Sequence, residues 1–137
     1  MPKQLVKSSE QLPAVGYIRL DEHDDAAFAV LLKDIASCCV RESLRLVRTF
    51  YDQGYDGSQL ARPGIVELRE VLKDTTSLVV IVPTLDHLSP VEVIRSPLLL
   101  MIHKFGGKLL VANEPKGKLD DFGYGVWIGP DDEREPS

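Results

Sequence analysis

The stretch Val15-Gly16-Tyr17-Ile18-Arg19-Leu20-Asp21-Glu22 decides the fold and carries the first candidate site. Residues 14–20 are mostly apolar on both faces, which is typical of a buried strand in a parallel sheet. The strand ends in an arginine and then turns into acidic residues. A strand end that brings Arg19 and Asp21 together is where an α/β protein of this size would place a phosphate site or an acidic site.

Strand-like and helix-like patterns alternate along the next hundred residues. A helix is expected over residues 24–41, where apolar residues recur at helical spacing, and Asp21 is expected to cap it. Residues 44–51 alternate between apolar residues and arginine, which predicts an edge or half-exposed strand. Pro63 is placed to open a second helix, which extends to about Lys73. The continuous β-branched run Leu78–Val82 predicts a central strand that is covered on both faces.

A third helix and a fourth strand follow. Ser89-Pro90-Val91-Glu92 has the pattern of a capping box with proline in the first turn, and Pro97 predicts a kink or a restart of that helix. The run Leu98–Ile102 contributes more apolar side chains than one helix face can hide, so we expect part of it to face a partner. Gly106-Gly107 ends the helix, and residues 108–113 predict the fourth strand.

This alternation predicts a three-layer α/β/α domain with a mostly parallel sheet of four to five strands. The domain is expected over residues 14–130, with a possible fifth strand at 124–128, an N-terminal arm at 1–13 and an acidic tail at 131–137. Ligand sites in such sheets lie at the carboxyl ends of the strands. That rule gathers Arg19 and Asp21, the loop 52–62, and Asp86 and His87 at one edge.

Net charge, the length of apolar runs and the cysteine positions argue against several classes of function. The chain has 137 residues and a net charge of −5, which argues against free-standing nucleic-acid binding through a basic surface. It shows no apolar run near the roughly 18 residues that span a membrane, and no signal peptide. Cys38 and Cys39 are adjacent in sequence, so they offer neither a disulfide that would cross-link the fold nor the spacing of metal ligands. We therefore expect a cytoplasmic protein that needs no cofactor and no metal, although His23 with Asp21 and Glu22 is a weak candidate for a cation site.

Several motifs together resemble the serine recombinases, the resolvase/invertase family. The resemblance covers about residues 14–114, and it lies in the order and spacing of four short segments: Tyr17-Ile18-Arg19-Leu20-Asp21, Phe50-Tyr51-Asp52 with Asp56-Gly57 and Arg62-Pro63-Gly64, Leu85-Asp86-His87-Leu88-Ser89-Pro90, and Gly107-Lys108-Leu109. The first is similar to the family's tyrosine–x–arginine–valine–serine start. The third is similar to its leucine–aspartate–arginine–leucine–x–arginine run.

The resemblance implies a resolvase-like fold and a known chemistry. In the family a serine hydroxyl attacks a DNA phosphodiester, and arginines around the phosphate stabilise the charge that grows in the transition state. Carried over to this chain, the family positions are Arg19, Asp21, Arg62, Asp86 and His87, with Asp52 and Gly57 in structural roles. The nucleophile position holds Asp21, and His87 and Pro90 stand where the family has arginines. A carboxylate there would repel a phosphate, so the resemblance implies a domain that has lost the reaction.

Each of these positions also has a simpler interpretation. Arg19 can pair with Asp21 or Asp86 across the strand ends, and His87 can be an ordinary polar loop residue. Three functions remain open: a stand-alone recombinase-like domain that acts through protein contacts as a homo-oligomer or with a partner, an active or DNA-bound recombinase fragment, and a receiver-like switch with Asp86 as phosphoacceptor. The receiver pattern would want a hydroxyl after the fourth strand and a lysine after the fifth, and the chain has Ala112-Asn113-Glu114 and Gly129-Pro130 instead.

Overall fold

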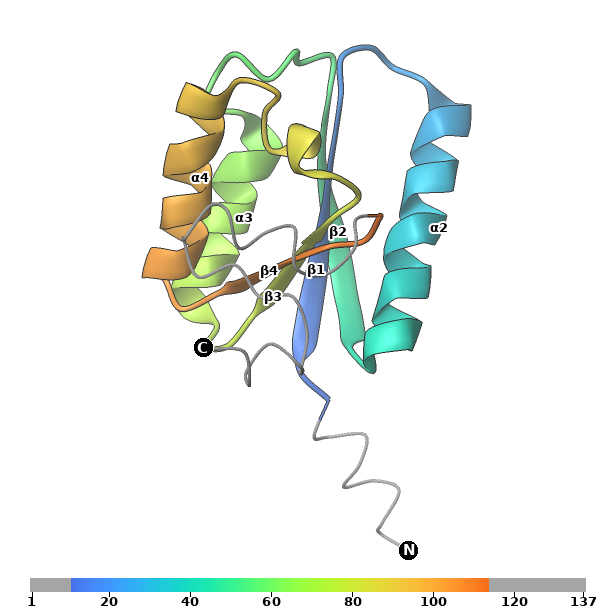
Figure 1. The fold of residues 1–137 in the computed structure, drawn as a ribbon, viewed down its shortest axis with the longest axis vertical. Helices are drawn as coiled ribbons and strands as arrows, with labels where there is room; N and C mark the ends of the chain where they lie inside the picture. Colours follow the sequence, from blue (N-terminus) through green and yellow to red (C-terminus); the bar gives the residue numbers. More distant parts are fainter. Residues whose placement is uncertain (1–10, 114–137) are drawn as a thin grey trace, which may run out of the picture.

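Four strands and three α-helices alternate along residues 11–113, the part of the chain that the computed structural model describes (Figure 1). The elements in chain order are β1 (Pro13–Leu20), α2 (Asp25–Glu42), β2 (Arg45–Gln53), α3 (Pro63–Asp74), β3 (Val79–Val82), the 3-10 turn η1 (Leu85–His87), α4 (Glu92–Lys104) and β4 (Lys108–Val111). All neighbouring strands are parallel, in the order β2-β1-β3-β4. The predicted three-layer α/β architecture with a parallel sheet is therefore confirmed.

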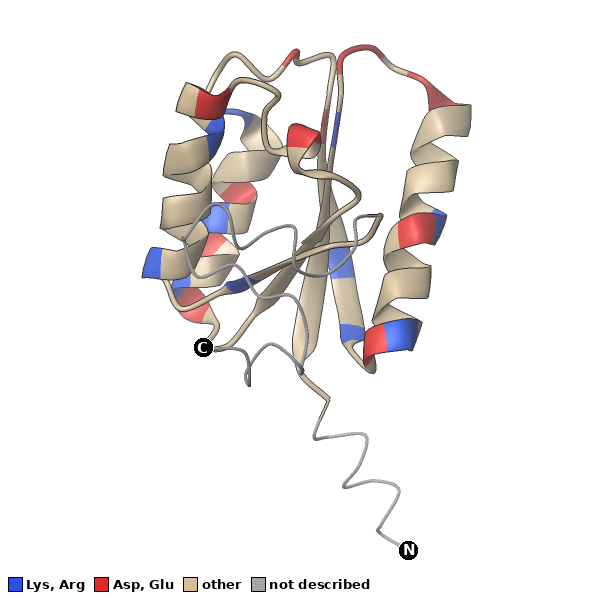
Figure 2. Cartoon of the chain, in the orientation of Figure 1, with Lys and Arg blue, Asp and Glu red and all other residues tan. Residues whose placement is uncertain are grey.

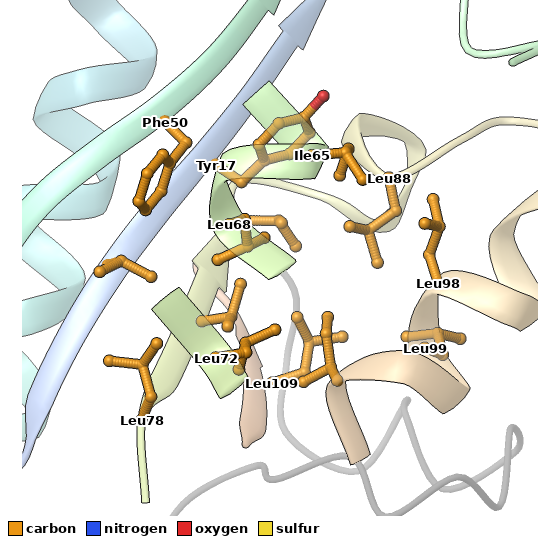
Figure 3. Close-up of a cluster of buried hydrophobic side chains, with 14 of the residues drawn as sticks. Tyr17, Phe50, Ile65, Leu68, Leu72, Leu78, Leu88, Leu98, Leu99 and Leu109 are labelled. Atoms are coloured by element: carbon orange, nitrogen blue, oxygen red, sulfur yellow. The ribbon is translucent and has the colours of Figure 1, made fainter. Parts of the chain in front are cut away.

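The helices cover both faces of the sheet, α2 on one side and α3 with α4 on the other (Figure 1). The larger cluster of buried side chains lies between the sheet and the pair α3 and α4, with Tyr17, Phe50, Leu68, Leu88 and Leu109 among its members (Figure 3). A smaller cluster lies under α2. Because both faces of the inner strands are covered, their side chains can be apolar on both faces, as the sequence pattern indicated.

The positions of the strands agree with the predictions. Every residue of β3 is buried, and β3 lies inside the sheet between β1 and β4. By contrast β2 lies at an edge, and its first four residues are exposed, which is the half-exposed character expected from its alternation. Tyr51 on β2 packs edge-on against Phe28 of α2 at 5.3 Å between ring centroids. β1 begins one residue earlier than predicted, because Pro13 already pairs with Arg45.

Two predictions about helix starts are wrong. Asp24, not Asp21, is the N-cap of α2, and its side chain accepts a hydrogen bond from the backbone N–H of Ala27 at 3.1 Å. The residue before α4 is Val91, which has no side-chain cap, so Ser89 and Glu92 form no capping box. In both cases the predicted capping residue has a stronger partner elsewhere, as the next section describes.

The predicted restart at Pro97 does not occur, because α4 is one continuous helix from Glu92 to Lys104. Proline removes one backbone donor, the one that would reach the carbonyl of Val93. Val93 is exposed, so water can satisfy that carbonyl. Within α4, Leu98, Leu99 and Ile102 are buried while Leu100 is half exposed, so most of the apolar run 98–102 faces the domain's own core.

Other predictions concern the cysteines and the chain ends. Cys38 and Cys39 are buried in the cluster under α2, and desolvation raises the pKa of the Cys39 thiol, which opposes reactivity. No helix within residues 11–113 has the length and hydropathy needed to cross a bilayer. Most of the predicted N-terminal arm, the fifth strand at 124–128 and the acidic tail lie outside the described residues.

Candidate functional site

The carboxyl ends of β1, β2 and β3 bring the predicted site residues to one end of the domain. Arg19 is the penultimate residue of β1, Asp21 follows that strand, and Asp86 and His87 lie in η1 after β3. Arg62 stands directly before α3, on the loop that follows β2. The topology thus gathers three chain segments, but the structure gives each of these residues a distinct environment.

Arg19 is almost fully buried, and its guanidinium group is bound on several sides. Nη1 donates to the Asp21 carboxylate at 2.5 Å and to the carbonyl of Tyr55 at 2.8 Å. Nη2 donates to the backbone carbonyl of Asp86 at 2.9 Å. Of the two carboxylates that could pair with Arg19, the structure therefore selects Asp21. Nε has no hydrogen-bond partner among the described residues.

Asp21 is the exposed half of this ion pair, with 69% of its side chain accessible to solvent. It lies three residues before the true N-cap of α2, which explains why it does not cap the helix. Its carboxylate instead neutralises the buried guanidinium group, whose burial without a counter-charge would cost several kcal/mol. An external anion that approached Arg19 would have to compete with this resident carboxylate.

His87 is held as a neutral acceptor. Its Nδ1 accepts a hydrogen bond from the backbone N–H of Arg19 at 3.0 Å, which requires the tautomer with hydrogen on Nε2. Desolvation and then the positive charge of Arg19 lower the pKa of His87 to about 4. At neutral pH the residue therefore supplies no positive charge. It joins η1 to the end of β1.

Arg62 is completely buried, although the sequence placed it among residues that face a phosphate. Nη2 donates to the carbonyl of Leu88 and Nη1 to the hydroxyl of Tyr17 at 3.3 Å. The guanidinium carbon lies 5.8 Å from the centroid of the Tyr17 ring, which places the charge within cation–π range. Desolvation lowers the pKa of Arg62. In this structure Arg62 ties α3 to the segment after η1 and offers no accessible donor.

Asp52 anchors the same buried network. It accepts hydrogen bonds from the Tyr17 hydroxyl at 2.6 Å, from the N–H of Gly64 at 2.7 Å and from the N–H of Ile65 at 3.2 Å. It therefore satisfies the first N–H groups of α3, a task that Arg62 as N-cap cannot perform. Burial, followed by the bond to Asp52, raises the pKa of Tyr17 far above its usual value.

Gly64 is required beside Asp52. A Cβ at this position would overlap the carbonyl oxygen of Tyr51 and would lie 2.8 Å from Oδ2 of Asp52. The close approach of α3 to the end of β2 depends on this glycine. Tyr17 and Gly64 were not among the candidate site residues. The signal that could have found Tyr17 is a phenol on an otherwise apolar strand, since a buried hydroxyl needs a partner.

Ser89 binds the loop after β2 rather than capping α4. Its hydroxyl donates to the carbonyl of Gly57 at 2.8 Å and accepts from the N–H of Val91 at 3.0 Å. Gly57 has a φ of +89°, and a Cβ there would lie 2.7 Å from Cδ of Pro90 and 3.1 Å from Nε of Arg19. The loop can therefore lie directly against the Arg19 guanidinium group only because residue 57 is glycine.

An open pocket of about 400 Å³ lies outside this layer, lined by Asp21, Gly54, Tyr55, Asp56, Ser58 and Gln59. Two carboxylates and no cationic side chain line it. The Ser58 hydroxyl donates to Asp56 at 2.7 Å, and this bond lowers the pKa of the Asp56 carboxyl, which is therefore ionised at neutral pH. The pocket is suited neither to phosphate nor, with two carboxylates alone, to a tightly bound metal ion. No group of three His, Cys, Asp or Glu side chains within residues 11–113 is arranged to hold one.

The surface around this pocket is also negatively charged. Acidic residues gather along the loops at this end of the sheet, whereas lysine and arginine are more frequent toward the opposite end (Figure 2). The exposed acids include Asp21, Glu22, Asp24, Asp25 and Asp56. The two arginines that belong to the site are buried and bound. The exposed carboxylates around this pocket therefore oppose the approach of a polyanion.

Comparisons with known proteins identify the family. The family described as "Resolvase, N terminal domain" matches residues 14–121. The N-terminal catalytic domain of TP901-1 integrase superposes with a TM-score of 0.69 at 19% identity, over 76% of this chain and 80% of that chain. The C-terminal catalytic domain of ISC1926 TnpA, an IS607-like serine recombinase, gives a TM-score of 0.65 at 17% identity, over 80% of this chain and 76% of that chain.

A third structure, the first open reading frame of transposon ISC1904 from Sulfolobus solfataricus P2, has a TM-score of 0.56 at 16% identity, over 80% of this chain and 73% of that chain. No curated protein sequence matches the chain. At these identities the solved structures establish the fold, and the family match over residues 14–121 establishes the ancestry. The chain therefore belongs to the resolvase N-terminal domain family, whose relatives of known structure include serine recombinase catalytic domains.

Proposed function

We propose that this recombinase-family domain does not cut DNA and acts through contacts with other proteins, as a homo-oligomer or as a subunit of a complex. The observation that carries the proposal is the ion pair between Arg19 and Asp21. The position at which the family resemblance expects a nucleophilic hydroxyl holds a carboxylate, and that carboxylate occupies the arginine that would bind the phosphate. The cytoplasm remains the expected compartment.

Two further contacts support the loss of the reaction. His87 stands at an expected arginine position and is neutral at pH 7, because its Nδ1 is an acceptor and its pKa is about 4. Arg62 is buried and donates its hydrogen bonds inward. Loss of one such donor or cation costs on the order of 100-fold in rate, and a second loss and a missing nucleophile leave no route to a covalent intermediate.

The alternative, an active or DNA-bound fragment, requires a cationic surface at the same end of the sheet. The acidic loops around Asp21, Glu22 and Asp56 oppose it (Figure 2). DNA affinity rests largely on neutralised phosphates and falls with salt. A domain of this charge is therefore expected to show no salt-sensitive DNA binding of its own.

The experiment is incubation of the purified chain with supercoiled DNA that carries varied sites, followed by denaturing electrophoresis for a protein–DNA adduct. We expect neither nicking nor an adduct. A covalent adduct formed by the unmodified chain would overturn the proposal. In that event Ser58→Ala would show whether the exposed Ser58 hydroxyl had replaced the missing nucleophile.

The variant Asp21→Ser sharpens this test. It restores a hydroxyl and removes the carboxylate from Arg19, but it leaves His87 neutral and Pro90 in place of a cation. We expect Asp21→Ser to remain inactive. Cleavage by this single variant would show that the nucleophile alone had been lost. The exposed neighbour Glu22→Ser is the matched control for a mere change of charge at this edge.

A further inference from the structure

The outer side of β2 is an open edge of the sheet. Among the described strands β2 pairs with β1 alone, so its outer backbone groups face no other described strand. The N–H of Gly54, directly after β2, donates to the carbonyl of Leu20 in β1 at 2.8 Å. Since successive backbone groups of a strand point to opposite sides, the N–H and carbonyl groups of Gln53, Tyr51 and Thr49 point away from β1. An edge of this kind is a template for pairing with another strand.

Exposed apolar side chains lie along this edge, on the face of the sheet that α2 covers. Tyr51 packs on Phe28 of α2 and is still 54% exposed. Alternation along the strand places Val47 on the same face as Tyr51, and it is also 54% exposed. Leu46 pairs with Ala14, which is buried under α2, so a β-bulge at Val47 leaves Leu46 and Val47 on one face. The bulge thus adds apolar surface to the edge.

We propose that β2 pairs with β2 of a second copy of this chain, antiparallel, about a two-fold axis that passes through Thr49. The inference names a partner for the protein contacts proposed above and rests on that proposal. In this register Val47 lies opposite Tyr51 of the partner subunit, and the same pair recurs on the other side of the axis. An aromatic ring opposite a β-branched side chain is a favourable cross-strand pair. Because each copy uses the same edge, the pairing closes at a dimer with one continuous sheet.

The side chains on the α3 face of the edge fit the same register. The guanidinium carbon of Arg48 lies 4.3 Å from the ring centroid of Phe50, and its Nη2 lies 3.7 Å from the carboxylate of Glu67 on α3. With the axis at Thr49, Arg48 lies opposite Phe50 of the partner subunit and not opposite another arginine. Each guanidinium group then has a second aromatic ring beside it, which is favourable for a cation.

The charges of the domain favour the antiparallel orientation. β2 begins with Arg45 toward the end of the domain where lysine and arginine are frequent, and it ends with Gln53 at the acidic end (Figure 2). The side chain of Gln53 accepts a hydrogen bond from the backbone N–H of Asp24, and exposed Glu22 and Asp25 are close to Asp24 in sequence. Antiparallel pairing brings the basic end of each copy to the acidic end of the other. A parallel pairing would join ends of like charge, which repel.

The test is sedimentation velocity of the full chain over a wide range of concentrations. We expect a monomer–dimer equilibrium that weakens as salt is added, because salt screens the attraction between the two ends. Val47→Lys and Arg45→Glu are each expected to raise the dissociation constant about tenfold or more, since each substitution occurs twice in a two-fold interface. Val93→Lys, on α4 and 71% exposed, is the matched control and should leave the dissociation constant unchanged. Circular dichroism checks that each variant is folded.

Thr49→Cys tests the register. Two residues that exchange hydrogen bonds across an antiparallel pair have Cα atoms about 5.5 Å apart, which is within the range that a disulfide spans. We expect Thr49→Cys to form a disulfide-linked dimer under mild oxidation. Val93→Cys, treated in the same way, should not form one. The native Cys38 and Cys39 are buried in the folded chain.

Three results would overturn the inference. The first is a strict monomer at every concentration. The second is a dimer that Val93→Lys weakens and Val47→Lys does not, which would place the interface on α4. The third is a dimer in which Thr49→Cys forms no cross-link. A monomer that forms no DNA adduct would refute this pairing alone, whereas a β2-paired dimer that forms a covalent DNA adduct would refute the loss of DNA cleavage alone.

Discussion

His87 is expected to make the stability of this domain depend on pH between about 4 and 6.5. Its pKa falls from the usual 6.5 to about 4 in the folded protein, because burial and the charge of Arg19 disfavour the imidazolium. The unfolded chain therefore binds a proton at a higher pH than the folded chain does. Since stability rises with pH wherever the unfolded state holds more protons, the stabilisation is complete above pH 6.5 and is lost as the pH falls toward 4.

The magnitude follows from the two pKa values. Integration from pH 7 to pH 5 gives a loss of about 1.5–2 kcal/mol from this one residue. The structural event behind it is protonation of Nδ1, which removes the acceptor for the Arg19 N–H and places a second positive charge beside its guanidinium group. The junction between β1 and η1 is the part of the fold that protonation weakens.

The assay is urea denaturation at pH 7 and pH 5 for the unmodified chain and for His87→Asn. Asparagine can present a carbonyl oxygen to the Arg19 N–H, but it cannot take up a proton. Other groups contribute equally to both proteins, so the difference between their pH dependences isolates His87. His103→Asn, at an exposed position in the last turn of α4, tests whether removal of any histidine has the same effect. Equal losses on acidification for His87→Asn and the unmodified chain would refute this reasoning.

Three substitutions test the Asp52 network, the close approach at Gly64 and the cap of α2 by urea or thermal denaturation. Asp52→Ala removes the acceptor of three hydrogen bonds near buried Arg62 and should cost about 3–5 kcal/mol; a loss below about 1 kcal/mol would contradict the network. Gly64→Ala forces a Cβ onto the Tyr51 carbonyl and should cost about 1–3 kcal/mol or prevent folding, and wild-type stability would show that α3 can shift. Asp24→Ala should cost about 1 kcal/mol through the lost cap of α2, with no effect expected if Asp21 were the cap.

Much of the fold could be predicted because the periodicity of side chains reports directly on burial. The run at 78–82 is apolar at every position, and only a strand covered on both faces can bury all of it, as β3 does. The arginines within 44–51 required contact with solvent, and β2 provides it as an edge strand whose first four residues are exposed. These patterns depend on the local chain alone.

Capping could not be predicted in the same way. Asp21 and Ser89 both have the right residue type and spacing to begin a helix, yet both bind elsewhere. Asp21 pairs with a buried arginine, and Ser89 binds a loop more than thirty residues away in sequence. A local motif competes with tertiary partners for the same side chain, and a buried charge or an unsatisfied carbonyl outweighs a cap worth about 1 kcal/mol.

The sequence by itself determined the order of strands and helices, the parallel sheet, and the edge at which Arg19, Asp21, Asp86 and His87 meet, because these follow from periodicity and from the handedness of crossovers. It also determined the residue types, and hence the missing hydroxyl at position 21. Only the tertiary structure decided that Arg62 is buried and bound inward, that His87 is a neutral acceptor, and that Asp21 occupies Arg19. The physical reason is that charge state and accessibility depend on neighbours brought together from distant parts of the chain.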